Sequence, residues 1–184
     1  MKWICIILFC AEVGLSCSSV GTSDHDAAAL RSIKTLAIGP YNTTEAALAV
    51  YEKIYIPLDT TIFNVLTRSG RFQTIIPHDT MCAGIDVRDR NAPHMLLARA
   101  EARHADALLL CTTDVMESEF RSMPLHDAAV TLVLISTKDS TVIMRTTCST
   151  KARGEYFVLP EHFRVVHDAA EGAAQQMLRA CGKK

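Results

Sequence analysis

Residues 106–150, DALLLCTTDVMESEFRSMPLHDAAVTLVLISTKDSTVIMRTTCST, contain three runs that are rich in branched and apolar residues. Short polar segments separate these runs at Ser122-Met123-Pro124 and at Lys138-Asp139-Ser140. Apolar runs of this length with turn residues between them are typical of β-hairpins. The stretch therefore predicts three consecutive antiparallel strands joined by two tight turns.

The segments on either side extend this core into a mixed sheet. We expect one buried strand over 33–38, ended by Gly39-Pro40, and a second short strand over 71–77. Apolar residues at helical spacing predict the helices 45–55, 57–69, 91–105 and 160–181. The order β-α-β-α-β-β-β-α predicts an α/β (α+β) fold with a single mixed sheet of about five strands and helices packed on it.

The first sixteen residues have the form of an export signal. Lys2 precedes an apolar run from Trp3 to Ala11, and small residues follow. Glu12 makes the run too short to cross a bilayer. Gly14-Leu15-Ser16-Cys17 resembles the lipobox of bacterial lipoproteins, which implies that residues 1–16 are removed and that Cys17 carries a diacylglycerol and a further fatty acid such as palmitate. The alternative is a plain secretory signal cut nearby, which would leave Cys17 as an unpaired thiol.

The lipid at Cys17 would make the membrane the first partner of this chain. Residues 17–31 are rich in Ser, Gly and Asp at their start, so we expect a flexible tether there and one domain over 32–184. Ser18 after the cysteine resembles outer-membrane sorting in bacteria that follow that rule. The predicted location is therefore the bacterial cell envelope, on the periplasmic side of the outer membrane.

The charge of the chain is nearly balanced. There are 19 Lys and Arg against 20 Asp and Glu, which gives a net charge of −1, and 49% of the residues are hydrophobic. That composition suits one globular core, and it lacks the basic bias of nucleic-acid-binding proteins. We therefore expect no nucleic-acid partner.

Four cysteines fall within the predicted domain: Cys82, Cys111, Cys148 and Cys181. Two disulfides are one option in an exported protein. No C-x-x-C spacing occurs, and three of the four lie in apolar segments, which favours free thiols. The predicted turns place Cys148 about five residues beyond the position opposite Cys111, out of disulfide reach.

Catalytic motifs are missing from the sequence, with no nucleotide-binding glycine loop, G-x-S-x-G or H-E-x-x-H. The histidines are scattered, and only His78-Asp79 with Cys82 suggests a partial metal site on a loop. Cys111 follows three leucines in a predicted buried strand, which does not suit a nucleophile. We expect no enzyme activity, no cofactor and no metal.

Three short motifs point to a known domain. They are Gly70-Arg71-Phe72 at the second strand, Ala105-Asp106-Ala107 entering the third, and Lys138-Asp139-Ser140 in the last turn. Residues 33–180 resemble the small α/β domain shared by the curli-secretion-channel lipoproteins, the peptidoglycan-synthase activator lipoproteins and the amino-terminal domain of the Tol translocation protein. The motifs specify the fold more than an activity.

The resemblance implies a non-catalytic, tethered protein-binding or assembly module whose partner is an envelope protein. The alternative is an oligomeric structural or secretion-associated lipoprotein, similar to the curli channels without their pore hairpins, and hence a homo-oligomer. Two segments combine charge with an aromatic residue, as protein interfaces often do, although ordinary solvated loops have the same composition. Their candidate partner-binding residues are Glu117, Glu119, Phe120, Arg121, Lys151, Arg153, Tyr156 and Phe157.

Overall fold

The computed structural model describes residues 17–23, 26–43, 58–86, 89, 91–120, 123–153 and 160–182. Its strands are β1 (Cys17–Ser23), β2 (Thr35–Thr43), β3 (Thr74–Ile76), β4 (Ala107–Phe120), β5 (Met123–Ser136) and β6 (Val142–Arg153). Its helices are α1 (Ala27–Ser32), α3 (Leu58–Ser69), α4 (His78–Cys82), α5 (Ala92–Ala102) and α6 (Pro160–Ala180). The helix that we predicted over 45–55 lies outside the described residues.

One mixed sheet forms the centre of the molecule, as predicted. Its strand order is β1-β6-β5-β4-β2-β3. Strand β2 pairs in parallel with β3 and β4, and the remaining neighbours are antiparallel. The predicted α/β fold with helices on a single sheet is confirmed, and β1 adds an edge strand that the sequence did not suggest.

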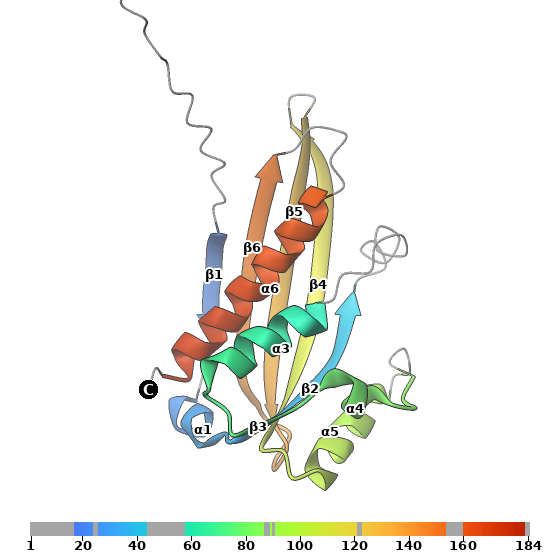
Figure 1. Ribbon diagram of the computed structural model, residues 1–184, viewed down its shortest axis with the longest axis vertical. Coiled ribbons are helices and arrows are strands. Elements are labelled where there is room, and N and C mark those ends of the chain that lie inside the picture. Colours follow the sequence, from blue (N-terminus) through green and yellow to red (C-terminus); the bar gives the residue numbers. More distant parts are fainter. Residues whose placement is uncertain are drawn as a thin grey trace, which may run out of the picture.

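Helices cover the two faces of the sheet unequally (Figure 1). On one face α6 packs across β5 and β6, with α3 beside it. On the other face α4 and α5 pack over β2 and β4. The second face buries a smaller cluster, which includes Ala37, Met81, Leu96 and Leu108.

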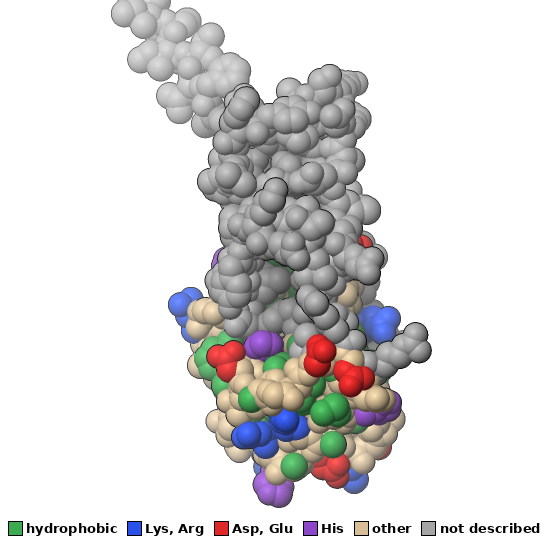
Figure 2. Space-filling model, turned by 90° about the vertical axis from the view of Figure 1, so that its right-hand side faces the viewer, with side chains coloured by type: hydrophobic (Ala, Val, Ile, Leu, Met, Phe, Trp, Pro, Cys, Tyr) green, Lys and Arg blue, Asp and Glu red, His purple; other side chains and the backbone are tan. Residues whose placement is uncertain are grey.

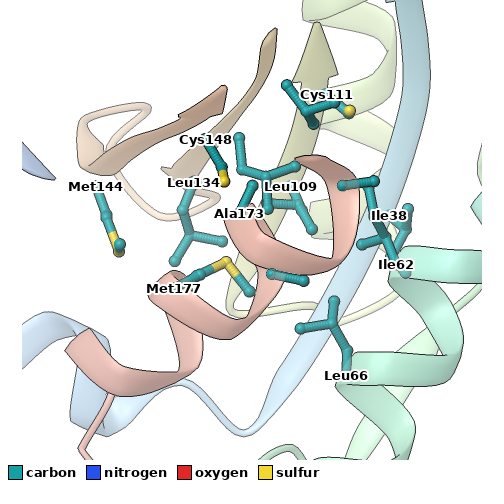
Figure 3. Close-up of a cluster of buried hydrophobic side chains, with 14 of the residues drawn as sticks. Ile38, Ile62, Leu66, Leu109, Cys111, Leu134, Met144, Cys148, Ala173 and Met177 are labelled. Atoms are coloured by element: carbon teal, nitrogen blue, oxygen red, sulfur yellow. The ribbon is translucent and has the colours of Figure 1, made fainter. Parts of the chain in front are cut away.

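The larger core lies under α6. Figure 3 shows Ala173 and Met177 of α6 beside Leu109 and Leu134 of the sheet. Four alanines of α6 are completely buried, Ala169, Ala170, Ala173 and Ala174. Because alanine has only a methyl side chain, the helix can approach the sheet closely, and the sheet supplies the larger leucines that fill the space.

The expected tether over 17–31 contains two elements, so that expectation is corrected. Cys17 pairs with Thr150 and Ser19 with Cys148, which makes 17–23 a strand on the edge of β6. Asp26 caps α1, because its Oδ1 accepts from the backbone N–H groups of Ala28 and Ala29 at 2.9 and 3.0 Å. The composition does not reveal this strand, because backbone hydrogen bonds hold it to β6. Serine and glycine provide backbone N–H and C=O groups as any other residue does.

Two predicted strand breaks are also corrected. Strand β2 continues through Gly39-Pro40 to Thr43. Its pairing with β4 shifts register between Ile38 and Tyr41, so the strand includes Gly39-Pro40 without ending there. Strand β5 begins at Met123, which pairs with Phe120 at the end of β4, so Met123 and Pro124 belong to a strand and not to the predicted turn.

The second hairpin turns at Lys138-Asp139-Ser140, as predicted. The N–H of Ser136 donates to the carbonyl of Thr141 at 2.8 Å, and Asp139 Oδ1 accepts from the Thr141 hydroxyl at 2.8 Å. The side-chain and backbone hydrogen bonds to Asp139 hold the pKa of its carboxyl below the usual range, with Ser136 and Thr141 as the donors.

Candidate functional site

The predicted partner-binding residues come together at one end of the sheet. Glu117 lies opposite His126, which in turn lies opposite Ala152. Glu119 lies opposite Pro124, and Arg153 lies opposite Leu125. Two segments that are distant in the sequence therefore share one edge of the fold, with β5 between them. We name this region the hairpin end and define it as residues 117–120 of β4, 123–127 of β5 and 151–153 of β6.

Of the eight candidates, Glu117, Glu119, Phe120, Lys151 and Arg153 occupy backbone positions in the hairpin end. Arg121, Tyr156 and Phe157 lie outside the described residues. The two acidic residues lie on β4 and the two basic residues on β6, with β5 between them, and Lys151 lies opposite Asp127 of β5. Mixed charge of this kind suits contact with a protein better than contact with a polyanion.

Cys17 lies at the same end of the sheet as these residues. Strand β1 runs antiparallel to β6 and starts at the pair Cys17–Thr150. Thr150 lies opposite Ala128 of β5, and β5 begins at Met123, five residues further along the hairpin. At about 3.4 Å per residue, the hairpin extends about 17 Å past the level of Cys17. Figure 1 shows β1 beginning on the side of the molecule to which the hairpin extends.

Arg71 of the first motif stabilises the backbone of α1. Its guanidinium donates to the carbonyls of Leu30, Arg31 and Ile33 at 2.9, 3.0 and 3.1 Å. These are carbonyls at the C-terminal end of α1, which have no partner within the helix. The guanidinium also lies 5.6 Å from the centre of the Phe72 ring. The arginine of this motif thus stabilises the C-terminal end of α1.

Asp106 of the second motif holds the start of β2. Its Oδ2 accepts from the backbone N–H groups of Lys34 and Thr35, both at 2.8 Å, and its own N–H donates to the carbonyl of Thr35 at 2.9 Å. From the sequence, this motif is expected only to mark the fold. An acidic residue directly before an apolar strand was the signal for the hydrogen-bonding role.

Burial favours the protonated form of three thiols, because it raises their pKa values. It raises the pKa of Cys111 to about 12, against the smaller effect of the nearby Thr113 hydroxyl, which lowers it. It also raises the pKa of Cys82 to about 11, which the charge of Arg99 lowers and that of Asp79 raises. Burial raises the pKa of Cys181 too, against the charge of Arg71. A protonated thiol is a poor nucleophile.

The register also changes the predicted distance between Cys111 and Cys148. Cys111 pairs with Leu132, and Leu132 pairs with Thr146, so Cys148 is two residues beyond the opposite position instead of about five. The difference follows from the register of β4 and β5, in which Phe120 already pairs with Met123. Strand β5 still separates the two cysteines, and neither forms a disulfide.

The described residues do not assemble the partial metal site suggested by the sequence. His78 Nδ1 lies 3.4 Å from Asp79 Oδ1. In the described part of the chain, no three His, Cys, Asp or Glu side chains are grouped so that they could hold a metal ion.

A pocket that the sequence analysis did not identify lies where the C-terminal ends of α3 and α6 meet. Its volume is about 420 Å³. The end of α3 and the start of the following segment contribute Ser69, Gly70 and Arg71, and the end of α6 contributes Gln175, Leu178, Arg179 and Gly182. We name it the α3–α6 pocket. Figure 1 shows the C-terminal ends of α3 and α6 close to α1.

The described residues on the side of the molecule that Figure 2 shows carry charges of both signs. In Figure 2, acidic, basic and histidine side chains alternate over the described lower part of this face, with small apolar areas between them. None of the helices in the described ranges is both long enough and apolar enough to cross a bilayer.

No family model matches this chain, and no curated protein matches it. Solved structures are similar to it. The lipoprotein GNA1162 from Neisseria meningitidis has a TM-score of 0.51 at 10% identity, covering 79% of this chain and 99% of that chain. The PelC dodecamer from Paraburkholderia phytofirmans has a TM-score of 0.50 at 17% identity, covering 92% and 99%. The hypothetical protein CT253 from Chlamydia trachomatis has a TM-score of 0.50 at 13% identity, covering 83% and 98%.

At such low identity these similarities show the fold alone. The chain shares a small α/β fold with the lipoprotein GNA1162, which confirms that part of the predicted resemblance. Assignment to the curli-channel, synthase-activator or Tol groups stays a prediction.

Proposed function

We propose that this protein is a non-catalytic lipoprotein of the bacterial cell envelope, anchored by lipid at Cys17, which binds or assembles an envelope protein through its hairpin end. The observation that carries the proposal is the pairing of Cys17 with Thr150. It attaches the anchor residue directly to the sheet, at the same end as the candidate partner-binding residues.

The anchor would control the orientation of the domain. Each buried CH₂ of a lipid chain contributes about 0.8 kcal/mol, so two or more chains hold a protein at a bilayer almost permanently. Because β1 is paired from its first residue, little slack separates the lipid from the sheet. The hairpin end then faces the membrane surface, and the partner is a protein at or in that surface.

A second candidate function is a homo-oligomeric assembly. The support is the similarity in fold to the PelC dodecamer. In this case the hairpin end would contact another copy of the same chain. Native mass spectrometry of the lipidated protein in detergent separates the two functions, because an adaptor is monomeric at micromolar concentration and a ring has one fixed multiple of the protomer mass.

Lipidation is tested by the mass of the protein isolated from membranes. We expect a mature chain that starts at Cys17 with the added mass of its acyl groups, and a Cys17→Ser variant that leaves the membrane fraction. An unmodified Cys17 in a chain that still carries residues 1–16 would refute the anchor.

Partner binding is tested by a photo-crosslinking residue in intact cells. At Glu119, in the hairpin end, we expect discrete protein adducts. Glu101, which is exposed at the end of α5, serves as the matched acidic control. Identical adducts from both positions, or none from Glu119, would contradict a partner site at the hairpin end.

A further inference from the structure

The α3–α6 pocket presents cationic groups with unused hydrogen-bonding capacity. A guanidinium has five N–H donors. Arg71 donates three hydrogen bonds, from Nη1 and Nη2, to the carbonyls around the end of α1. Within the described residues, the guanidinium of Arg179 makes no hydrogen bond or ion pair, and more than a third of its residue surface is exposed. Each Arg thus retains donors that a ligand could use.

Neutral groups complete the polar side of the α3–α6 pocket. The Ser69 hydroxyl donates to the carbonyl of Leu66 and accepts from the N–H of Arg71 at 3.1 Å, so it is fixed in place. Gln175 Nε2 donates to Glu171 Oε1 at 2.9 Å, so the carboxylate of Glu171 has a hydrogen-bond partner one turn away on α6. Among the described residues, no acidic side chain lines the pocket.

The remaining walls give the pocket its apolar side and its opening. Leu178 is partly exposed and packs against the main core with its other side. Gly70 and Gly182 both have positive φ, and a Cβ built on either one would meet no atom within 4 Å. The volume of about 420 Å³ lies within the range of small-molecule sites, which is about 300–1,000 Å³.

We propose that the α3–α6 pocket binds a carboxylate attached to a short apolar group, with Arg71 and Arg179 donating to the carboxylate and Leu178 contacting the apolar part. Planar guanidinium groups match the geometry of carboxylates and can bind them through two parallel hydrogen bonds. The ligand is either a free short-chain acid or the carboxyl end of a peptide. This site is distinct from the hairpin end and does not depend on the function proposed there.

The test is a titration of the purified full chain, followed by the NMR shifts of the Gly70, Arg179 and Gly182 amides. The probes are N-acetyl-Ala-Ala, its C-terminal amide, and propionate. We expect N-acetyl-Ala-Ala to shift the three amides, and its amide to have no effect at the same millimolar concentrations because it lacks the charge. Tighter binding of N-acetyl-Ala-Ala than of propionate assigns the site to peptide ends, and the reverse assigns it to free acids.

Matched variants locate the binding. Removing a donor to a charged group costs about 1.5–3 kcal/mol, so Arg179→Gln should weaken binding by about tenfold or more. Arg68→Gln removes an equal charge from the last turn of α3 without changing the pocket lining, and we expect less than about a twofold effect. Equal binding of the acid and the amide, equal losses in the two variants, or no shift of the three amides would overturn the proposal.

Discussion

At the scale of single residues, the charged side chains of two sequence motifs, Asp106 and Arg71, form hydrogen bonds with backbone groups of other elements. Asp106 accepts hydrogen bonds from the N–H groups of Lys34 and Thr35 at the start of β2. Arg71 donates hydrogen bonds to the carbonyls of Leu30 and Arg31 at the end of α1. Arg99 does the same for α4, because its guanidinium donates to the carbonyls of Met81 and Ala83. Unsatisfied backbone groups are costly where the chain packs tightly, so these contacts determine where short elements begin and end.

Substitution of Asp106 tests this role. Asp106→Ala removes two hydrogen bonds from a charged acceptor, and we expect the free energy of unfolding to fall by about 1–3 kcal/mol. Asp106→Asn retains an acceptor oxygen and should cost less. Urea unfolding measures both, with Glu101→Gln as the control for loss of one exposed carboxylate. Equal stability of Asp106→Ala and the control would contradict the assignment.

Gly39 is required by close packing within the sheet. A Cβ at this position would lie 2.7 Å from Leu110 Cδ2 and 3.1 Å from the carbonyl oxygen of Leu109. We expect Gly39→Ala to destabilise the fold by about 1–3 kcal/mol, as overpacking does. Combining it with Leu110→Ala removes the nearest atom, so the double variant should lose less than the sum of the two single losses. Additive losses in thermal unfolding would show that the contact is not the cause.

The buried thiol of Cys111 predicts a fall in stability at alkaline pH. Its pKa is raised from 9.0 to about 12, so between these values the unfolded chain releases a proton that the folded chain retains. The free energy of unfolding is therefore unaffected by this thiol below pH 9 and decreases as the pH rises above it, by up to about 1.4 kcal/mol per pH unit. Denaturant unfolding at several pH values measures this change. We expect the free energy of unfolding to fall less steeply with pH in Cys111→Ala than in the unchanged chain, and an equal fall in both would refute the assignment.

At the scale of elements, side-chain periodicity made some parts of the fold predictable and not others. The three long strands and α6 carry repeating apolar positions, so their existence followed from the sequence. Strand β1 has no such pattern, and Gly39-Pro40 suggested an end where the sheet instead shifts its register. In both cases the deciding contacts are backbone pairings between distant segments, which local composition does not encode.

Of the two candidate sites, the sequence indicated the hairpin end but not the α3–α6 pocket. The hairpin end was found because charge and aromatic residues occur together in two short segments, Glu117–Arg121 and Lys151–Phe157. The α3–α6 pocket depends on the meeting of Arg71 with Arg179, which are remote in the sequence and look like ordinary surface residues. Only the packing of α3 against α6 brings them to one pocket.

Deletion of β1 tests whether it belongs to the folded domain. A chain that starts at Asp26 retains the cap of α1 but leaves the edge of β6 unpaired from Arg145 to Thr150. We expect a lower unfolding temperature than for the chain that starts at Cys17, by roughly 2–4 °C for each kcal/mol lost. The exposed edge of β6 should also promote association. If residues 17–25 were a flexible tether, the two chains would unfold at the same temperature.

At the scale of the whole molecule, the lipid and the hairpin end should approach the same membrane. Fluorescent labels at Met123→Cys, at the start of β5, and at Met95→Cys, on α5, compare the two positions. Met95 is 45% exposed, so its label should not disturb the core. In vesicles with quencher-bearing headgroups, we expect stronger quenching of the label at 123. Equal quenching would mean that the domain has no fixed orientation.

The pairing of β1 with β6 also affects how the protein would respond to tension. A pull on the acyl chains, for instance when the envelope deforms, would act along the axis of β1. Hydrogen bonds between antiparallel strands are perpendicular to the strands, so this pull shears the paired positions from Cys17 to Ser23 together rather than unzipping them one after another. An anchor joined in this way resists extraction of the domain far better than the same strand would if it were peeled from its end.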